Sequence, residues 1–399
     1  MAVTIDSGAV ATDDPLANDL AVSMDEAVAN QDVETTQFAT MLMRMPTAQA
    51  SSFKEEWMRD EYLPKNTALS ASAASADTAL SITTSEGAYA KVGDVVLIVA
   101  TGEHVRITTG GASAWTVVRA IGSVAAATAA SGTGAGGLII LNGSNEQGGT
   151  MPTSLVTEKV TDYNYCGIVR NSWEYTETAQ WVKWYSGNPL SYARKKIALE
   201  HKREIENVLW FGPRSYSAGT THPRCTTGGV THYVSATSDA AGTFDKGELQ
   251  DFLRNGMEFG NPNRKVLFCA PIVAQVISEF LQDNWVRAEL AGNPSVFGVK
   301  ANAVISGVTG GSIPVFVKND WKRYTEGTGK QIGSRAYLID MSDVELLKAK
   351  PTKRGSRWAT LYTNLQANDK DSTAEEFLSE FTFKLKTPSA HRELTGVTG

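Results

Sequence analysis

The sequence predicts a protein of mixed α+β class in several lobes, with a small β-domain inserted into an extended loop. A long helical pattern covers 190–211, helical and strand patterns alternate over 240–341, and short strand patterns separated by small residues fill 68–150. A chain of 399 residues exceeds the ~250–300 residues at which a single core usually stops growing. We therefore expect two or three lobes.

Residues 1–50 are expected to form an N-terminal arm. Asp14-Pro15 is a helix-start signal, because proline is tolerated at the first helical position. The apolar residues that follow recur roughly every four positions: Leu16, Leu20, Met24 and Val28. A second apolar run starts at Phe38 and ends at Pro46. An arm of this kind has little core of its own, so we expect it to pack on neighbouring subunits.

Residues 51–186 are expected to form the extended loop, with the inserted β-domain at about 84–150. Small residues dominate two stretches of this region, one before the insertion and one within it (SASAASADTALS and SVAAATAASGTGAGG). Strand patterns lie between them, and Asn142-Gly143 is a turn dipeptide. The expected strands are about four in number: 95–100, 104–108, 115–120 and 138–141.

Residues 155–186 have the pattern of extended structure and are rich in aromatic side chains. These are Tyr163, Tyr165, Trp173, Tyr175, Trp181, Trp184 and Tyr185. On a monomer they would risk an exposed apolar patch, whereas against a neighbouring copy they would be interface anchors. Packing inside the chain's own core is the alternative, and the residues by themselves leave both open.

The longest helix is expected from Leu190 to Phe211. Asn188 can cap it, Pro189 can open it and Gly212-Pro213 ends it. Its apolar side consists of Leu190, Ala193, Ile197, His201, Ile205 and Val208. At 1.5 Å per residue the helix is about 35 Å long.

From residue 240 onward the alternation of elements indicates an α+β or α/β lobe. Helices are expected at 245–259 and 271–285. Strands are expected at Lys265–Cys269, Ala303–Ile305, Ile313–Lys318 and Ala336–Met341. Two long strands, Trp358–Gln366 and Glu376–Lys386, close the chain.

Composition and charge exclude several classes of protein. The chain has 37 Lys and Arg against 43 Asp and Glu, a net charge of −6, so it lacks the domain-wide basic face that tight DNA binding requires. The basic stretch 194–203 is interleaved with glutamates and is typical of a solvated or intersubunit helix face. Three scattered cysteines make no disulfide framework. No apolar run approaches the ~20 residues of a membrane span, so we expect a soluble protein made in a cytoplasm.

The candidate chemical motifs each favour a non-catalytic interpretation. Gly132–Gly137 satisfies G-x-G-x-x-G, but a strand pattern follows it instead of the helix that a dinucleotide site needs. His222, Cys225 and His232 lack a fourth zinc ligand. His201 lies on the apolar side of the long helix, where an interface histidine is expected rather than a catalytic base. No nucleophile-elbow, Walker-type or H-E-x-x-H motif occurs, so we expect no enzyme, cofactor or metal site.

The order of arm, extended excursion, long charged helix, α+β lobe and final strands resembles the Hong Kong 97 fold of tailed-phage major capsid proteins. Within that fold, the chain is similar to the family with a small β insertion in the extended loop. The motifs that resemble this family are Trp57-x-x-Asp60, Val92-Gly93-Asp94 through Val117-Val118-Arg119, Asn164-Tyr165 through Ile168-x-Arg170, Tyr192 through Glu206, Glu380 through Leu385, Ala390-His391 and Gly396. The similarity covers roughly residues 35–399.

The resemblance implies a division into domains. Residues 1–50 would be the N-terminal arm, 51–186 the extended loop with its insertion, and 187–240 the spine helix and the start of the peripheral domain. Residues 241–345 would be the axial domain, and 346–399 would return to the peripheral domain.

The resemblance also implies a structural, self-assembling protein of the virion. Copies would form pentamers and hexamers of an icosahedral head around double-stranded DNA, which is held in loose contact. The expected partners are a scaffolding protein, a portal and a cement protein. A separate scaffolding protein is expected because the chain begins at Met1. The expected assembly-interface residues are Trp57, Asp60, Tyr165, Arg170, Trp173, Tyr175, Trp181 and Trp184.

Three other functions stay open on the sequence. An encapsulin-like compartment would share the fold but would enclose enzymes in place of DNA. An enzyme would need a deep pocket with a perturbed titratable pair. A carbohydrate-binding protein is suggested by the aromatic β-segments.

Overall fold

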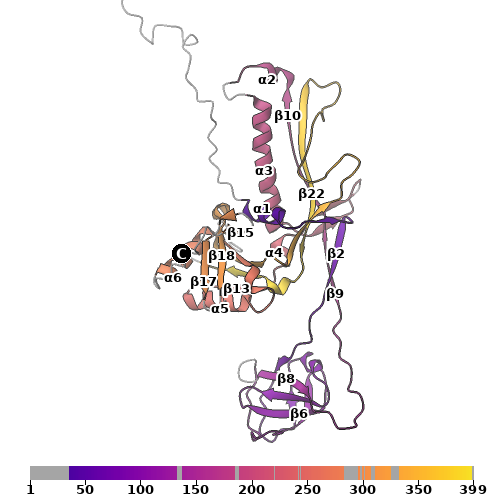
Figure 1. The fold of residues 1–399 in the computed structure, drawn as a ribbon, viewed down its shortest axis with the longest axis vertical. Helices are drawn as coiled ribbons and strands as arrows, with labels where there is room; N and C mark the ends of the chain where they lie inside the picture. Colours follow the sequence, from indigo (N-terminus) through magenta and orange to yellow (C-terminus); the bar gives the residue numbers. More distant parts are fainter. Residues whose placement is uncertain are drawn as a thin grey trace, which may run out of the picture. The chain divides into compact units, whose positions relative to one another are not determined.

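The computed structural model describes two compact units of the chain (Figure 1). One unit contains residues 1–57 and 162–399, and the other contains Met58–Thr161. The described residues are 36–132, 137–184, 188–219, 221–240, 242, 244–282, 295–296, 299–300, 302–306, 311–324 and 332–397. The predicted helix start at Asp14-Pro15 lies outside them.

The larger unit contains a five-stranded sheet built around one long strand. Strand β22 (Ser372–Leu385) pairs antiparallel with β10 (Gly167–Thr176) over ten residues, from Gly167 opposite Phe381 to Thr176 opposite Ser372. On its other side β22 pairs with β20 (Val344–Ala349) and with β21 (Thr360–Tyr362). The short β1 (Ala48–Ala50) continues the sheet, parallel to β20. Residues 167–176 thus belong to this sheet, although the sequence placed them in the extended loop.

A second, six-stranded sheet of the larger unit has the order β13-β23-β19-β14-β18-β17. Its central strand β14 (Lys265–Cys269) is buried at every residue, as expected for a strand covered on both faces. The other strands are β13 (Thr237–Asp239), β17 (Asn302–Ser306), β18 (Gly311–Val317), β19 (Ala336–Asp340) and β23 (Arg392–Thr395). Because β14 pairs parallel with β18 and antiparallel with β19, the lobe is α+β.

Two helices accompany this sheet. Helix α5 (Lys246–Gly256) starts with a capping box between Asp245 and Glu248. It ends three residues before the predicted 259, since Gly260 adopts a φ of +80° and Pro262 follows in a 3-10 turn (Pro262–Arg264). Helix α6 (Pro271–Gln282) begins as predicted, and residues 283–285 lie outside the described part.

The predicted long helix is α3 (Pro189–Phe211). The side-chain Oδ1 of Asn188 accepts hydrogen bonds from the backbone N–H groups of Leu190 (2.9 Å) and Ser191 (3.4 Å), and Gly212 ends the helix. The helix runs beside β10 and β22 (Figure 1). Its apolar side faces inward as predicted, with Ala193, His201 and Ile205 buried.

The second apolar run of the arm is helix α1 (Gln37–Arg44). The sequence predicted that the arm packs on neighbours, but Phe38, Met41 and Leu42 are buried in the main core of their own chain. Phe38 contacts the rings of Trp210 and Phe268, with centroid distances of 4.7 and 5.4 Å. The arm is therefore part of the core from residue 37 onward.

The smaller unit is a β-barrel of six strands, two more than predicted. The sheet order is β3-β8-β5-β6-β7-β4, and a bridge between Leu69 and Ile82 joins its two ends, so the sheet closes on itself. The strands are β3 (Asn66–Ala68), β4 (Ala79–Ser81), β5 (Asp94–Ile98), β6 (Glu103–Thr109), β7 (Ala114–Val118) and β8 (Gly137–Gly143). Strands β3 and β4 were missed because their small, polar residues lack a strand pattern.

The barrel interior is filled by alternating inward side chains. These are Leu80, Ile82, Val96, Ile98, Val105, Ile107, Trp115, Val117, Leu138 and Ile140. The indole N–H of Trp115 donates to the carbonyl of Gly87 (2.9 Å), so the largest core side chain also has its polar group satisfied. A closed barrel of this kind has no exposed sheet edge to protect.

One strand prediction was wrong. The pattern at Trp358–Gln366 predicted a long strand, but β21 contains only three residues. Ala359 and Asn364 on either side of it have positive φ values of 47° and 56°. That left-handed backbone does not continue a strand, so β21 is short at both ends.

The remaining helices and strand pairs are short. Short helices α2 (Glu177–Trp181) and α4 (Val230–Tyr233) flank α3 in the sequence. The two-stranded pairs are β2 (Lys54–Arg59) with β9 (Val160–Tyr165), β11 (Ser215–Ser217) with β12 (Arg224–Thr226), and β15 (Ser295–Val296) with β16 (Val299–Lys300).

Cys166, Cys225 and Cys269 are all free thiols. Among the described residues, no helix is long and apolar enough to cross a membrane.

A buried ion pair holds the long loops of the barrel in place. Arg119 donates to both carboxylate oxygens of Glu103 (2.7 and 2.6 Å) and to the carbonyl of Ala74 (2.8 Å). Burial alone would raise the pKa of Glu103, but Arg119 and the amides of Ala127 and Ala120 reverse this, and the pKa lies below its usual value. The folded barrel therefore holds Glu103 as a carboxylate.

We predict that Glu103→Gln destabilises the barrel, because it leaves the Arg119 charge buried without its partner; such losses are about 3–5 kcal/mol. Because the folded pKa is depressed, the stabilisation by Glu103 is present above the ordinary carboxyl pKa and is lost as the pH falls through the folded value. Hydrogen exchange of β5–β7 peptides should show this loss in the wild type and not in Glu103→Gln. The exposed Glu146→Gln is the control, and equal protection in both variants would contradict the prediction.

Candidate assembly surfaces

The rigid body of the larger unit is organised around the buried carboxylate of Glu206 on α3. Its oxygens accept hydrogen bonds from the backbone N–H groups of Phe38 (3.2 Å) and Ala39 (2.6 Å) at the start of α1. Lys318 forms an ion pair with it at 2.6 Å, and the indole N–H of Trp210 donates to it at 3.1 Å. Glu206 and Lys318 are both almost completely buried. One carboxylate thus joins α1, α3 and the segment after β18.

A row of carboxylates on β22 fixes α3 and β10 to the sheet. Arg194 of α3 pairs with the buried Glu375 (Nε to Oε2, 2.7 Å). Arg170 of β10 pairs with Glu376 (Nη2 to Oε2, 2.7 Å). Bidentate guanidinium–carboxylate pairs of this kind fix geometry as well as charge, so the helix and the sheet form one rigid element.

His201 completes this contact at the middle of α3. Its ring lies between the side chains of Asn171 on β10 and Ser379 on β22, and it stacks on Phe377 with centroids 5.9 Å apart. Burial lowers its pKa, which favours the neutral ring that this packing requires. His201 therefore packs inside its own chain, between α3 and the sheet, whereas the sequence predicted an interface histidine.

Three of the predicted interface aromatics lie inside or against the chain's own core. Trp57 is 6% exposed and faces Tyr233 at 5.9 Å. Trp173 is 8% exposed and packs on Phe377 at 5.3 Å. Tyr165 is half-buried in a ring cluster. For Trp173 the structure therefore supports the intramolecular alternative that the sequence left open, and Trp57, predicted at an interface, is buried in its own chain.

Two other predicted residues are exposed at α2. Trp181 is 77% exposed, and Trp184 is also exposed while its indole N–H donates to the carbonyl of Ala179 (2.7 Å). The neighbouring Val182 and Tyr192 are exposed as well. We call these four side chains the α2 tip. Each of the four keeps 40% or more of its surface exposed in the described chain.

The last three predicted residues have polar surroundings. Asp60 is exposed and accepts a hydrogen bond from the hydroxyl of Thr157 (3.0 Å). Arg170 makes the ion pair with Glu376, with much of its side chain exposed. Tyr175 is half-buried on β10. The structure does not bring the eight predicted residues together in one site.

A set of exposed apolar residues escaped the sequence analysis. We call residues 58–65 and 149–161, which lead into and out of the barrel, the strap. It contains large apolar side chains that are almost fully exposed: Tyr62 (99%), Met151 (89%), Val156 (83%) and Met58 (72%). Isolated apolar residues are a weak sequence signal in a segment without periodicity, so only the exposure in the structure identifies them.

The sequence analysis also missed a cluster of aromatic rings at the C-terminal end of β9. Phe53, Tyr165 and Tyr216 stack on one another, with centroids 5.5–6.3 Å apart. The Arg214 guanidinium lies 4.1 Å above the ring of Tyr163. Phe53 and Tyr216 are about half exposed, so the cluster presents an aromatic face to its surroundings.

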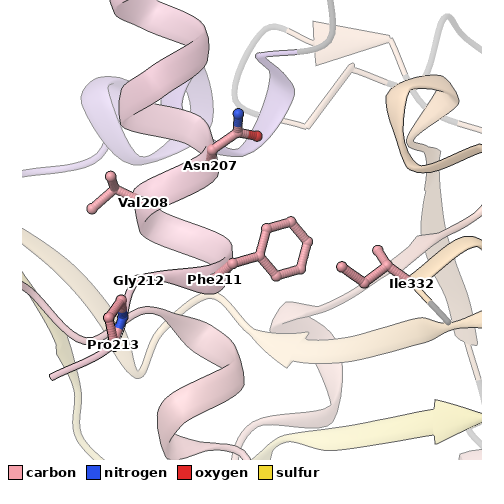
Figure 2. A pocket seen from close by; sticks show the side chains of 6 residues that line it. All are labelled: Asn207, Val208, Phe211, Gly212, Pro213 and Ile332. Atoms are coloured by element: carbon pink, nitrogen blue, oxygen red, sulfur yellow. The ribbon is translucent and has the colours of Figure 1, made fainter. Parts of the chain in front are cut away.

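Among the described residues, one cavity has a lining without chemically active side chains. An open cavity of about 370 Å³ lies at the C-terminal end of α3, lined by Asn207, Val208, Phe211, Gly212, Pro213 and Ile332 (Figure 2). None of these side chains titrates or acts as a nucleophile. Within the described ranges, no group of three or more His, Cys, Asp or Glu could hold a metal ion.

The motifs weighed in the sequence also lack the context of a site. Strand β8 begins at Gly137, the last glycine of the G-x-G-x-x-G pattern, and residues 133–136 lie outside the described part. Cys225 lies on β12, opposite Tyr216 in the neighbouring strand, and His232 contacts the ring of Tyr233 at 5.0 Å. Burial raises the pKa of Cys225, which makes it a poor nucleophile.

Comparisons with known proteins agree with an assembling shell. The family model described as SU10 major capsid protein matches residues 7–398. The major capsid protein of Pseudomonas phage PaMx41 is 26% identical over 213 residues, which are 50% of this chain and 50% of that protein. The match thus spans about half the length of that relative.

Two solved structures share the fold. The capsid asymmetric unit of cyanophage A-1(L) has a TM-score of 0.56 at 10% identity, covering 96% of this chain and 98% of that one. The capsid of a native GTA particle has a TM-score of 0.51 at 8% identity, covering 96% and 97%. These similarities confirm the predicted Hong Kong 97-type fold.

We predict that Lys318→Met lowers the unfolding free energy of the larger unit by about 3–5 kcal/mol, because it leaves the Glu206 carboxylate buried without its cation. The exposed Lys322→Met, four residues later, is the matched control. Calorimetry would measure the loss, and hydrogen exchange should locate it first in α1. If Lys318→Met and Lys322→Met both lower the unfolding free energy equally little, Glu206 does not organise the core.

Two tryptophan variants distinguish a buried side chain from an exposed one. Trp173→Ala should lower the stability of the isolated chain by about 3–5 kcal/mol, as for other buried tryptophans. Trp181→Ala should change it by less than about 0.5 kcal/mol and should reduce particle yield instead. Thermal melting and sedimentation measure the two effects. An equal loss of melting temperature in both variants would contradict the assignment.

Proposed function

The chain belongs to the family of SU10 major capsid proteins, and from this premise we propose that its copies form the pentamers and hexamers of an icosahedral head around phage double-stranded DNA. It acts as structural material and not as an enzyme. The virion is its final location, and we propose that assembly takes place in the cytoplasm of the bacterial host.

The observation that carries this proposal is the exposure of the strap. A side chain such as Tyr62, fully exposed in the isolated chain, gains about 1.5–3 kcal/mol when it is buried against a partner. Four such side chains on an extended segment suit a contact that lies across a neighbouring copy. Modest contacts of this kind are sufficient, because closure of a symmetric shell multiplies them.

The α2 tip provides a second proposed contact. Trp181, Val182, Trp184 and Tyr192 lie at the end of α3 that is remote from Glu206 in sequence. Exposed tryptophan and tyrosine are the residues most often found at the centre of interfaces. Because α3 is fixed to β22 by ion pairs, the tip is held on a rigid support.

The remaining parts receive roles in the same proposal. The α3 helix with β10 and β22 would form the peripheral body, and the lobe of α5, α6 and the six-stranded sheet would meet its copies around the axes of pentamers and hexamers. The barrel would decorate the outer surface. A scaffolding protein, a portal and a cement protein are the proposed partners, with DNA in loose contact.

Electron microscopy of the purified protein, together with size-exclusion chromatography, tests the proposal. Closed shells, capsomer rings or tubes are expected. A monomer of 42.8 kDa at high concentration, also in the presence of a co-expressed scaffolding protein, would contradict it.

We predict that the triple variant Tyr62→Ser, Met151→Ser, Val156→Ser reduces particle yield at least about tenfold, since it removes several kcal/mol of apolar burial per contact. Its melting temperature should stay near that of the wild type. The matched control replaces exposed valines of the barrel, Val92, Val99 and Val118, by serine. If the control lowers yield as much as the strap variant, the strap is not the contact.

A further inference from the structure

The loop between β20 and β21 concentrates positive charge. Five basic residues, Lys348, Lys350, Lys353, Arg354 and Arg357, lie within ten positions, and no acidic residue occurs between Glu345 and Asp369. This basic loop stands out in a chain whose net charge is −6.

The fold gives the basic loop a defined shape. The backbone groups of Thr352 and Gly355 exchange two hydrogen bonds of 2.9 Å, which places Lys353 and Arg354 at the tip of a tight turn. Gly355 has a φ of +107°, a conformation that glycine tolerates without strain. The base of the loop is fixed by the ion pair of Arg357 with Glu380.

The basic side chains at the tip have no anionic partner among the described residues. Residues 350–356 are all exposed, and the ion pairs of the described chain do not include Lys350, Lys353 or Arg354. The ammonium of Lys348 lies 5.3 Å from the ring of Trp358. Three cations held close together without a carboxylate repel one another, so the loop is suited to bind a polyanion.

The opposite charge is concentrated at the start of the same chain. Residues 1–43 contain eight acidic residues and no basic one: Asp6, Asp13, Asp14, Asp19, Asp25, Glu26, Asp32 and Glu34. Without these eight, 35 acidic residues would face 37 basic ones in the whole chain. The acidic segment therefore accounts for the entire negative net charge.

The part of the chain that follows the acidic segment pairs with the strand that leads into the basic loop. Strand β1, which follows the acidic segment and α1, pairs with β20, and Ala50 lies opposite Ala349, directly before Lys350. A segment of 35 residues can span up to about 3.3 Å per residue, so its length does not limit this contact. Attachment to the same chain gives the segment an effective concentration in the millimolar range.

We propose that the acidic N-terminal segment, residues 1–35, docks on the basic loop 348–357 of its own chain. Charge complementarity drives the contact, so added salt weakens it. DNA phosphates are the competing polyanion, and the docked segment would shield the loop from them. This inference does not depend on shell formation, so it can fail while the capsid function holds.

Zero-length carbodiimide cross-linking of the full chain tests the docking. Cross-links from carboxylates of residues 6–34 to Lys350 or Lys353 should exceed those to the exposed Lys195, Lys246 and Lys322 and should decrease at high salt. When a mixture of unlabelled and nitrogen-15-labelled chains is cross-linked, in whatever assembly state it adopts, both halves of each cross-link should carry the same label. Cross-links without enrichment at the loop, or with mixed labels, would overturn the proposal.

Binding of a short fluorescent DNA duplex tests whether the acidic segment or DNA occupies the basic loop. A chain that starts at Thr36, which keeps the whole described structure, should bind about tenfold more tightly at low salt than the full chain. The variant Lys350→Gln, Lys353→Gln, Arg354→Gln should cancel that gain, whereas Lys195→Gln, Lys246→Gln, Lys322→Gln should not. If removal of the segment leaves the affinity unchanged while the loop variant weakens binding, the loop is a DNA contact and the docking proposal is wrong.

Discussion

A buried carboxylate must be fully paired, and this constraint on Glu206 determines how the larger unit is put together. Its partners come from three parts of the chain: the first amides of α1, the ammonium of Lys318 and the indole of Trp210. None of them can move without leaving a charge unpaired in the core. The start of α1, the C-terminal half of α3 and the end of β18 in the six-stranded sheet are therefore fixed relative to one another by one side chain.

Paired charges inside the molecule and exposed apolar side chains on its surface belong to different parts of the chain. Ion pairs between β22 and the arginines of α3 and β10 use charge to fix elements inside the unit, and the paired Glu103 and Arg119 do so inside the barrel. The most exposed of the large apolar side chains in the described chain lie on the strap and at the α2 tip. A protein that assembles into a shell needs both: a body that keeps its shape and surfaces that gain free energy only against another copy.

The net charge of −6 does not show how unevenly charged residues are distributed along the chain. The first 43 residues have only acidic charges, and the loop 348–357 has only basic ones. For a shell that surrounds DNA, an acidic segment near a basic loop would limit how strongly the wall holds the packed genome, because the segment and the phosphates compete for the same cations.

The sequence by itself determined the elements whose signals are local. Asn188, Pro189 and Gly212 set the ends of α3, and the mostly apolar β14 and the alternating β22 were predicted within a few residues. The tertiary structure decided what depends on distant partners. Strands β3 and β4 exist because they close the barrel, β21 is short because Ala359 and Asn364 turn the backbone, and Trp57 and Trp173 are buried although they resemble interface anchors. The exposure of Tyr62 was equally invisible, because caps and periodicity depend on neighbours in sequence, whereas burial depends on which segments meet in space.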